Sequence, residues 1–490
     1  MDQPARVDGP ARLDRRVLAV AAAVSAVLLA FAAGYGYHRD ELYFIACGRH
    51  LAWGYADQGP VTPLIARVMT AIAPDSLVLL RLPSALAAGA TVLVTGLVAR
   101  EVGGTRRAQL IAAGTAAVAS IVLVTGHLFS TSTFDLLVWT VLGWLVVRAV
   151  LRGADRLWLL VGVVLGVGLL NKPLPAFLAA GLLAGVVISG PRRLLRSPWL
   201  WAGAGLALAL WSPWLAWQAD HGWPQLDVSR SIASGGSTSS QPWWAVVPFQ
   251  VLLVSPLLAP VWIAGLVAVF RRRELRFVGW AWVLLAIVFM ATGGKPYYLG
   301  GMLPLLVGVG APEVDGWLAR GRGRGRWLAA ALAVSAVIGV IIALPLLPRS
   351  ALDPVLAVNP DVGETVGWPA FVRTVAGVDH SLGDPAGVVV FAQNYGEAGA
   401  VDRYGPALGL PPAASGHNAY GYWGHPADDR APVIVLGYDL TEAAQWFRGC
   451  RVATRIDTGI DNDEDGGPVL VCTAPRSIWA QLWPDVRHLG

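Results

Sequence analysis

Long apolar runs recur through the first 348 residues and constrain the fold of this chain more than any other feature. They are about 16–22 residues long, the length that a helix needs to cross a hydrocarbon core of roughly 30 Å. The chain is 55% hydrophobic and 14% charged, against about 25% charged residues in an ordinary soluble domain. These runs predict a polytopic α-helical membrane protein with eleven transmembrane helices, at about 17–36, 78–98, 108–126, 133–150, 157–170, 174–189, 198–217, 246–270, 277–292, 297–315 and 327–347.

The segments between these runs alternate in charge. One set, with the N-terminal residues, holds 21 basic residues, and the opposite set holds 7. By the positive-inside rule the N-terminus is cytoplasmic, and an odd number of spans places the C-terminus outside. The first run lacks a small-residue cleavage site and is expected to stay as a transmembrane helix. The net charge of +5 is an orientation signal and does not predict a nucleic-acid partner.

Two external segments and the C-terminal part have their own character. Segment 37–77 contains two apolar patterns at helical spacing, which predict amphipathic helices on the outer membrane surface. Segment 218–245 carries a Gly/Ser tract and is expected to be a mobile loop. From residue 349 to 490, short β-rich runs alternate with helical patterns, which predicts an extracytoplasmic α/β domain. Cys450 and Cys472 both fall in it, and the sequence leaves open whether they are bridged.

Three acidic residues, at two places in the sequence, are the first candidates for a functional site. Asp40 and Glu41, in "YHRDELYF", follow the first span, and Asp135 lies just inside the fourth. An acid in these places is either a helix cap at the interface or a functional group, since an ionisable residue within a membrane segment is costly. The predicted topology puts all three residues on the external side, as one shared site would require.

The two lysines carry the second signal. Of 37 basic residues, only Lys172 and Lys295 are lysine. Both lie at external ends of spans and both precede proline. An ammonium is a compact charge suited to phosphate. The alternative is interfacial snorkelling, which arginine would serve equally well.

Other patterns narrow the chemistry. "DNDEDGG" (461–467) begins like a calcium loop, but Cys472 stands where a bidentate Glu is needed. Neither a paired-histidine metal spacing nor a Walker loop nor a dinucleotide fingerprint occurs, so the sequence requires no cofactor and argues against a nucleotide-driven pump. Tryptophans, dense at 199–223 and 243–244, favour interface belts, with a few available to stack on sugar rings.

Four blocks follow one another along the chain: "RDELYF", "HLFSTSTFDLLVW", "GLLNKPLPAFL" and "GKPYYLGGMLPLL", with the soluble run 394–424 after them. Together they resemble the GT-C glycosyltransferases, in particular the bacterial protein-mannosyltransferase-like and aminoarabinose-transferase-like (ArnT-like) membrane enzymes. The resemblance implies a catalytic membrane domain (1–348) in the bacterial plasma (inner) membrane. It also implies inverting transfer of a sugar from a polyprenyl-phosphate donor. Asp40 would act as base, with Glu41 completing the motif and Asp135 as the second acid.

The same resemblance suggests the contacts of the donor. Lys172, Lys295, Tyr297 and Tyr298 would face the lipid phosphate, with Arg39 and His127 as further candidate contacts. One block departs from the aminoarabinose transferases, which carry Lys-Pro-Pro where this chain has "DQGPVTP" (57–63). The sugar, the acceptor (protein, lipid or cell-wall glycan) and metal dependence stay open.

Two other classes of function are compatible with the sequence. A transporter or flippase of lipid-linked substrates would favour interrupted helices with ionisable groups near mid-membrane, whereas here the acids and lysines gather at one face. A non-catalytic scaffold that binds glycans through the external domain is the third reading.

Overall fold

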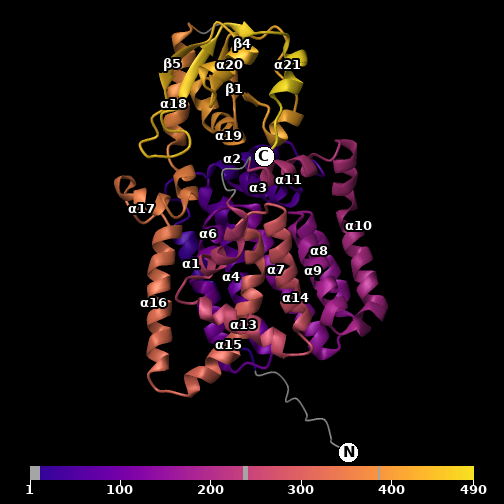
Figure 1. The fold of residues 1–490 in the computed structure, drawn as a ribbon. Coiled ribbons are helices and arrows are strands. Elements are labelled where there is room, and N and C mark those ends of the chain that lie inside the picture. The colour runs from indigo at the N-terminus through magenta and orange to yellow at the C-terminus, as the bar shows by residue number, and fades with distance from the viewer. Residues whose placement is uncertain (1–11, 236–240, 384–386) are drawn as a thin grey trace, which may run out of the picture.

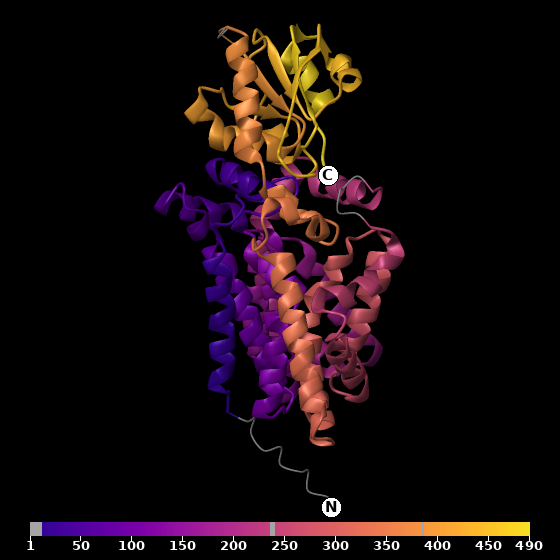
Figure 2. The ribbon, with the colours of Figure 1, turned by 90° about the vertical axis from the view of Figure 1, so that its left-hand side faces the viewer.

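The computed structural model describes residues 12–235, 241–383 and 387–490. A bundle of helices forms one part, and a C-terminal α/β region caps one end of it (Figures 1 and 2). The bundle contains α1 (Arg15–Ala30), α4 (Leu77–Glu101), α5 (Arg106–Ala117), α6 (Ser120–His127), α7 (Thr131–Arg152), α8 (Leu157–Leu169), α9 (Leu174–Ser189), α10 (Pro198–Asp220), α12 (Val246–Val254), α13 (Ala259–Arg271), α14 (Arg276–Ala291), α15 (Leu303–Ala319) and α16 (Arg324–Ala343). Short 3₁₀ turns are η1 (Arg192–Arg196), η2 (Trp243–Ala245), η3 (Pro296–Met302), η4 (Arg349–Ala351), η5 (Pro360–Thr365), η6 (Gly405–Leu408) and η7 (Asn418–Tyr422).

A helix or a bent helix pair lies at each of the eleven predicted runs. Within the described residues, α4, α7 and α16 are long and apolar enough to cross a membrane. Five spans result if α5 with α6, bent by 54°, and α12 with α13, bent by 117°, each count as one. The helical membrane character is therefore confirmed, while eleven crossings stay a prediction.

The segment predicted to carry surface helices folds as α2 (Arg39–Arg49) and α3 (Val61–Ile72). Helix α3 exposes Leu64, Val68 and Ile72, as an amphipathic helix does. Helix α2 differs from the expectation because residues 41–48 are all buried. It lies between the bundle and the α/β region (Figure 1), which covers its outer face. In segment 218–245 a helix, α11 (Pro224–Ala233), forms, and part of the predicted mobile tract, 236–240, lies outside the described residues.

The C-terminal region is built on a five-stranded sheet of order β2-β1-β3-β6-β5. Its strands are β1 (Val389–Ala392), β2 (Ala413–Ser415), β3 (Val433–Leu436), β5 (Arg451–Arg455) and β6 (Pro468–Cys472). Strand β1 runs parallel to β2 and β3, and β6 runs antiparallel to β3 and β5. A disulfide joins Cys450 to Cys472, which settles the alternative that the sequence left open.

Alternate residues of each central strand face opposite sides of this sheet. Val390 and Ala392 belong to one core with α18 (Trp368–Ser381) and α19 (Tyr395–Tyr404). The other face of the sheet packs against α20 (Leu440–Trp446) and α21 (Trp479–Val486). The remaining elements are α17 (Asp353–Leu356) and a small ladder of β4 (Phe447–Arg448) with β7 (Ala474–Pro475). The α18–α19 core also contains residues of α2, so the two parts of the molecule share one apolar cluster.

Helix α19 approaches α2 through glycines. A Cβ built on Gly399 would lie 2.9 Å from Cβ of Leu42, and one on Gly396 would lie 2.8 Å from Cβ of Arg39. Carbon atoms in contact need about 3.5–4.0 Å. The two helices therefore meet at a distance that only residues without a side chain allow.

We expect Gly399→Ala to lower the melting temperature, because overpacking a tight contact costs about 1–3 kcal/mol. Gly377→Ala in α18 is the matched control, since a Cβ there meets nothing within 4 Å, and alanine is favoured over glycine in helices by about 1 kcal/mol. Thermal unfolding of the purified chain should move in opposite directions for the two variants. A shift of the same sign in both would contradict the close α2–α19 contact.

Candidate active site

The candidate site begins at the N-terminus of α2. His38 is the N-cap, and its Nδ1 accepts a hydrogen bond of 3.1 Å from the Asp40 backbone N–H. The backbone N–H of His38 donates to Oε2 of Glu41 at 2.8 Å, which completes a capping box. The capping box therefore fixes the orientation of residues 38–41 at the start of α2.

Glu41 points into the protein and pairs with Arg81 of α4. Their side chains are 0% and 1% exposed, and Nε and Nη2 of Arg81 lie 2.7 and 2.8 Å from the carboxylate oxygens. The backbone N–H of Phe129 donates to the same carboxylate at 2.8 Å. Glu41 was predicted to complete the catalytic motif. With every side of its carboxylate engaged in the interior, the geometry favours a positioning role.

Asp40 faces the α/β region instead. It is half-buried, and the hydroxyl of Tyr395, the first residue of α19, donates to its Oδ1 at 2.9 Å. The guanidinium of Arg39 lies 5.3 Å from the centre of the Tyr395 ring. Arg39, predicted as a donor contact, pairs with Glu364 and Asp463 at 3.4 Å each. Residues of α2 and residues of the α/β region therefore both surround Asp40.

Lys172 lies beside the predicted aromatic contacts. Its Nζ is 5.5 Å from the ring centre of Tyr297 and 5.3 Å from that of Tyr298. It donates to Ser132 Oγ at 3.3 Å. Asp135, 7% exposed in α7, interacts electrostatically with this ammonium. The structure thus places Lys172 beside both tyrosines and within the electrostatic influence of Asp135.

The backbone carbonyl of Lys295 accepts a hydrogen bond of 3.0 Å from the Tyr298 N–H. Among the described residues, its ammonium has no hydrogen-bond or ion-pair partner. Burial lowers its pKa to about 8, helped by the nearby charges of Lys172 and Arg39, while Asp40 and Asp361 oppose the shift. The charges of Lys172 and Asp40 therefore both act on the Lys295 ammonium.

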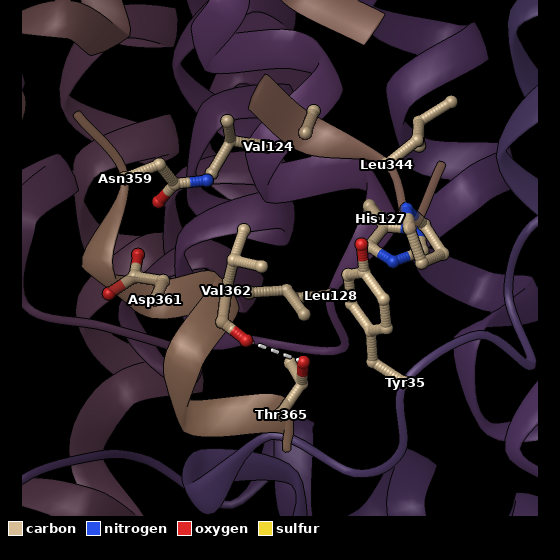
Figure 3. Close-up of a pocket in the computed structure, with 11 residues that line it drawn as sticks. Tyr35, Val124, His127, Leu128, Leu344, Asn359, Asp361, Val362 and Thr365 are labelled. Atoms are coloured by element: carbon tan, nitrogen blue, oxygen red, sulfur yellow. Dashed lines mark hydrogen bonds between the residues drawn. The ribbon is translucent and has the colours of Figure 1, made fainter. Parts of the chain in front are cut away.

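His127, the remaining predicted contact, lies elsewhere. Its Nε2 is 3.4 Å from Nη1 of Arg81, and the ring lines a small cavity with Tyr35, Asn359 and Asp361 (Figure 3). This cavity of about 10 Å³ has the room that one water needs. The structure associates His127 with the support of Arg81 and not with the lysines.

Two residues of the site were not predicted. Asp57 accepts from the Tyr43 hydroxyl at 2.8 Å and from Asn418 Nδ2 at 3.4 Å. Burial raises the pKa of Asp57 to about 6, with the Asp40 charge adding to the shift and the Tyr43 hydrogen bond and Lys172 opposing it. Tyr395 is the other, and no local pattern links it to Asp40, 355 positions away. A signal for Asp57 existed in "DQGPVTP", the block in which the sequence departs from its relatives.

Gln58 lies in the same segment, 57–63, and its side chain is buried. Its Nε2 lies 3.8 Å from Sγ of Cys47, so the side chain faces the protein interior. Within the described residues there is no group of three His, Cys, Asp or Glu side chains that could hold a metal ion.

Comparisons with known proteins find similarity in part of the sequence and in the fold. Residues 57–217 match the family model described as dolichyl-phosphate-mannose-protein mannosyltransferase. The match begins at Asp57, so Asp40 and Glu41 lie outside it. A search of curated proteins finds no match.

Solved structures extend the comparison to most of the chain. The apo crystal structure of ArnT from Cupriavidus metallidurans has a TM-score of 0.62 and 16% identity, over 93% of this chain and 97% of ArnT. The same protein bound to undecaprenyl phosphate gives a TM-score of 0.59, at 16% identity and the same coverage. The mycobacterial arabinofuranosyltransferase AftD gives 0.50 at 18% identity, over 94% of this chain and 40% of AftD. The fold of this chain is therefore similar to that of ArnT over nearly its whole length, and residues 57–217 resemble the mannosyltransferase family in sequence.

We expect Glu41→Ala to destabilise the chain strongly, because it leaves the Arg81 guanidinium buried and unpaired, at a cost of about 3–5 kcal/mol. Asp40→Ala is the matched control, since the neighbouring carboxylate is half-exposed and should cost far less. Thermal unfolding of both purified variants checks this contrast. Equal melting temperatures would contradict the positioning role of Glu41.

Proposed function

We propose that this chain is a membrane glycosyltransferase that moves a sugar from a polyprenyl-phosphate donor to an acceptor at the extracytoplasmic face, with inversion. The observation that carries the proposal is that Asp40 and Asp57, each hydrogen-bonded to a residue of the α/β region, both act electrostatically on Lys172, and that Asp40 also acts on Lys295. Glycosyl transfer needs these two kinds of group, a base for the acceptor and cations for the departing phosphate.

Asp40 is the proposed base. Tyr395 holds its Oδ1, which leaves the second oxygen to take the proton of the acceptor hydroxyl. The acceptor oxygen then bonds to the anomeric carbon, while the bond from that carbon to the phosphate oxygen breaks and its electron pair stays on the phosphate. Asp57 and Asp135 are proposed to orient the acceptor and to balance the charge of Lys172.

The lysines are the proposed contacts of the donor phosphate. Negative charge grows on this group as the sugar leaves, and preorganised cations in a partly water-excluded site stabilise such charge most effectively. Tyr297 and Tyr298 flank Lys172 and would border the same group. The ArnT structure solved with undecaprenyl phosphate supports a lipid phosphate as ligand.

The proposed site lies on the external side of the membrane. The turn between α15 and α16 carries Arg320 and Arg322, and Arg324 begins α16. This turn lies at the end of the bundle furthest from the α/β region (Figures 1 and 2). Arginine-rich short segments favour the cytoplasmic side. This arrangement supports a cytoplasmic N-terminus and an extracytoplasmic α/β region in the bacterial inner membrane.

A transporter would be favoured by charged groups at a helix break. The sharpest break, between α12 and α13, spans Ser255 to Leu258 and holds no charged residue. Ser255 Oγ lies 2.7 Å from Ser335 Oγ there. The ionisable groups gather instead at the junction, which favours transfer over transport.

We expect Asp40→Asn and Asp40→Ala to reduce the initial rate of transfer by about 10²–10⁴-fold, the usual contribution of a general base. The assay follows a labelled sugar from polyprenyl phosphate into the envelope fraction of a deletion strain. Asp155→Asn, an exposed acid in the turn between α7 and α8, should transfer at the wild-type rate. Full activity in both Asp40 variants would overturn its role as base.

We expect Lys295→Ala to raise KM for the donor more than Lys295→Arg, because arginine keeps a positive charge. The pKa of about 8 adds a pH dependence: the ammonium is present below pH 8 and is lost above it. The wild-type kcat/KM for the donor should therefore fall above about pH 8, and Lys295→Arg should remove this decline. Identical pH profiles and equal KM values in all three proteins would mean that Lys295 only extends its ammonium to the membrane interface.

A further inference from the structure

A second cavity lies next to the acids. It has a volume of about 330 Å³, within the range of ligand pockets. Its lining is dominated by six ring side chains: His50, Tyr55, Trp217, His221, Tyr422 and Trp423. We propose that this cavity binds the acceptor and that the acceptor is a neutral carbohydrate chain, an inference that rests on the proposed glycosyl transfer.

Three separate parts of the chain build the cavity. Its walls come from the segment after α2, from the end of α10, and from η7 with the residue that follows it. Buried hydrogen bonds hold these parts in place: Gln218 Nε2 donates to the Tyr55 carbonyl at 2.9 Å, and Trp214 Nε1 donates to the Gln58 carbonyl at 3.1 Å. The cavity is therefore formed before any ligand arrives.

The rings are arranged as stacked pairs. His50 and Trp423 stack with centroids 4.3 Å apart at 16°, and Trp217 and His221 stack at 4.0 Å and 15°. Tyr422 lies 6.1 Å from Trp217, and the guanidinium of Arg487 is 4.2 Å from the centre of the Tyr422 ring. Each tryptophan thus stands next to an imidazole that can donate or accept a hydrogen bond.

This lining selects for a neutral ligand with both apolar and hydroxyl surfaces. None of the described residues that line the cavity is an aspartate, glutamate, lysine or arginine. A charged peptide would lose its hydration without gaining a counter-charge, and an acyl chain would bury imidazole nitrogens without partners. A sugar ring presents C–H faces to aromatic rings and hydroxyls to imidazoles. The volume suits roughly one or two such rings.

The cavity is also connected to the acids. Ala56 lines it and directly precedes Asp57. Ala419 lines it as well, and its backbone N–H donates to the Tyr43 hydroxyl at 3.1 Å. That hydroxyl donates in turn to Asp57 at 2.8 Å. A carbohydrate in the cavity would therefore present its terminal hydroxyl beside Asp57, on which the charge of Asp40 also acts.

Binding of soluble disaccharides to the full chain tests the proposal. The protein is reconstituted in lipid nanodiscs, because glycoside detergents would supply a competing sugar. Maltose, cellobiose, lactose and α-1,6-mannobiose are titrated by calorimetry, with saturation-transfer NMR as the second readout. We expect millimolar binding of at least one of them and about tenfold weaker binding by Trp423→Ala, the size of one aromatic contact. Trp327→Ala, 76% exposed at the start of α16, should bind like the wild type.

Two further variants separate the subsite from the reaction. Ala52→Phe fills the cavity without removing a ring and should abolish disaccharide binding. Asp40→Asn should lose transfer and keep disaccharide binding, which separates this subsite from the proposed reaction. Failure of all four disaccharides to bind the wild type, or equal binding by Trp423→Ala, would overturn the subsite. Sugar binding without any transfer would instead overturn the proposed function alone.

Discussion

The site depends on one buried ion pair, between Glu41 and Arg81. Removing two charges from water costs several kcal/mol per ion, and only excellent geometry with further hydrogen bonds repays this cost. Here Arg81 also donates to the carbonyls of Ala32 and Gly36 at 2.8 and 2.9 Å, so the pair ties the end of the first helix, α4 and the start of α2 together. Neighbouring helical residues point about 100° apart. Fixing Glu41 inward therefore turns Asp40 toward the α/β region.

The α/β region belongs to the site and is not an appendage to it. It contributes Tyr395 to Asp40 and Asn418 to Asp57, and it surrounds Arg39 with acids. Burial raises the pKa of Glu364, and the charge of Glu464 adds to the shift. Burial also raises the pKa of Glu464, helped by Glu397 and Asp463, while Arg39 opposes both shifts. The close glycine contact between α2 and α19 sets the distance over which these groups meet. A change in that contact would alter the surroundings of the proposed base without touching it.

The sequence predicted the parts of the fold that depend on local periodicity. The apolar runs became helices, and the β-rich runs became strands. It could not predict that α2 is buried, because an apolar pattern does not reveal whether lipid or protein covers it. Nor could it predict Tyr395 or Asp57, whose roles arise from contacts between segments that are distant in sequence. Glu41 and Asp40 look equivalent in "RDELYF", and only the position of Arg81 separates them.

The proposed reaction also explains why two lysines persist in a chain with 35 arginines. Arginine keeps its charge at all accessible pH values, so it would hold substrate and product phosphates alike. A buried lysine with a pKa near 8 responds to its neighbour, because each negative charge that appears nearby favours the ammonium form. As the sugar departs, the phosphate gains charge and the lysine becomes more firmly protonated. Its interaction therefore strengthens toward the transition state, and only such strengthening accelerates the chemical step.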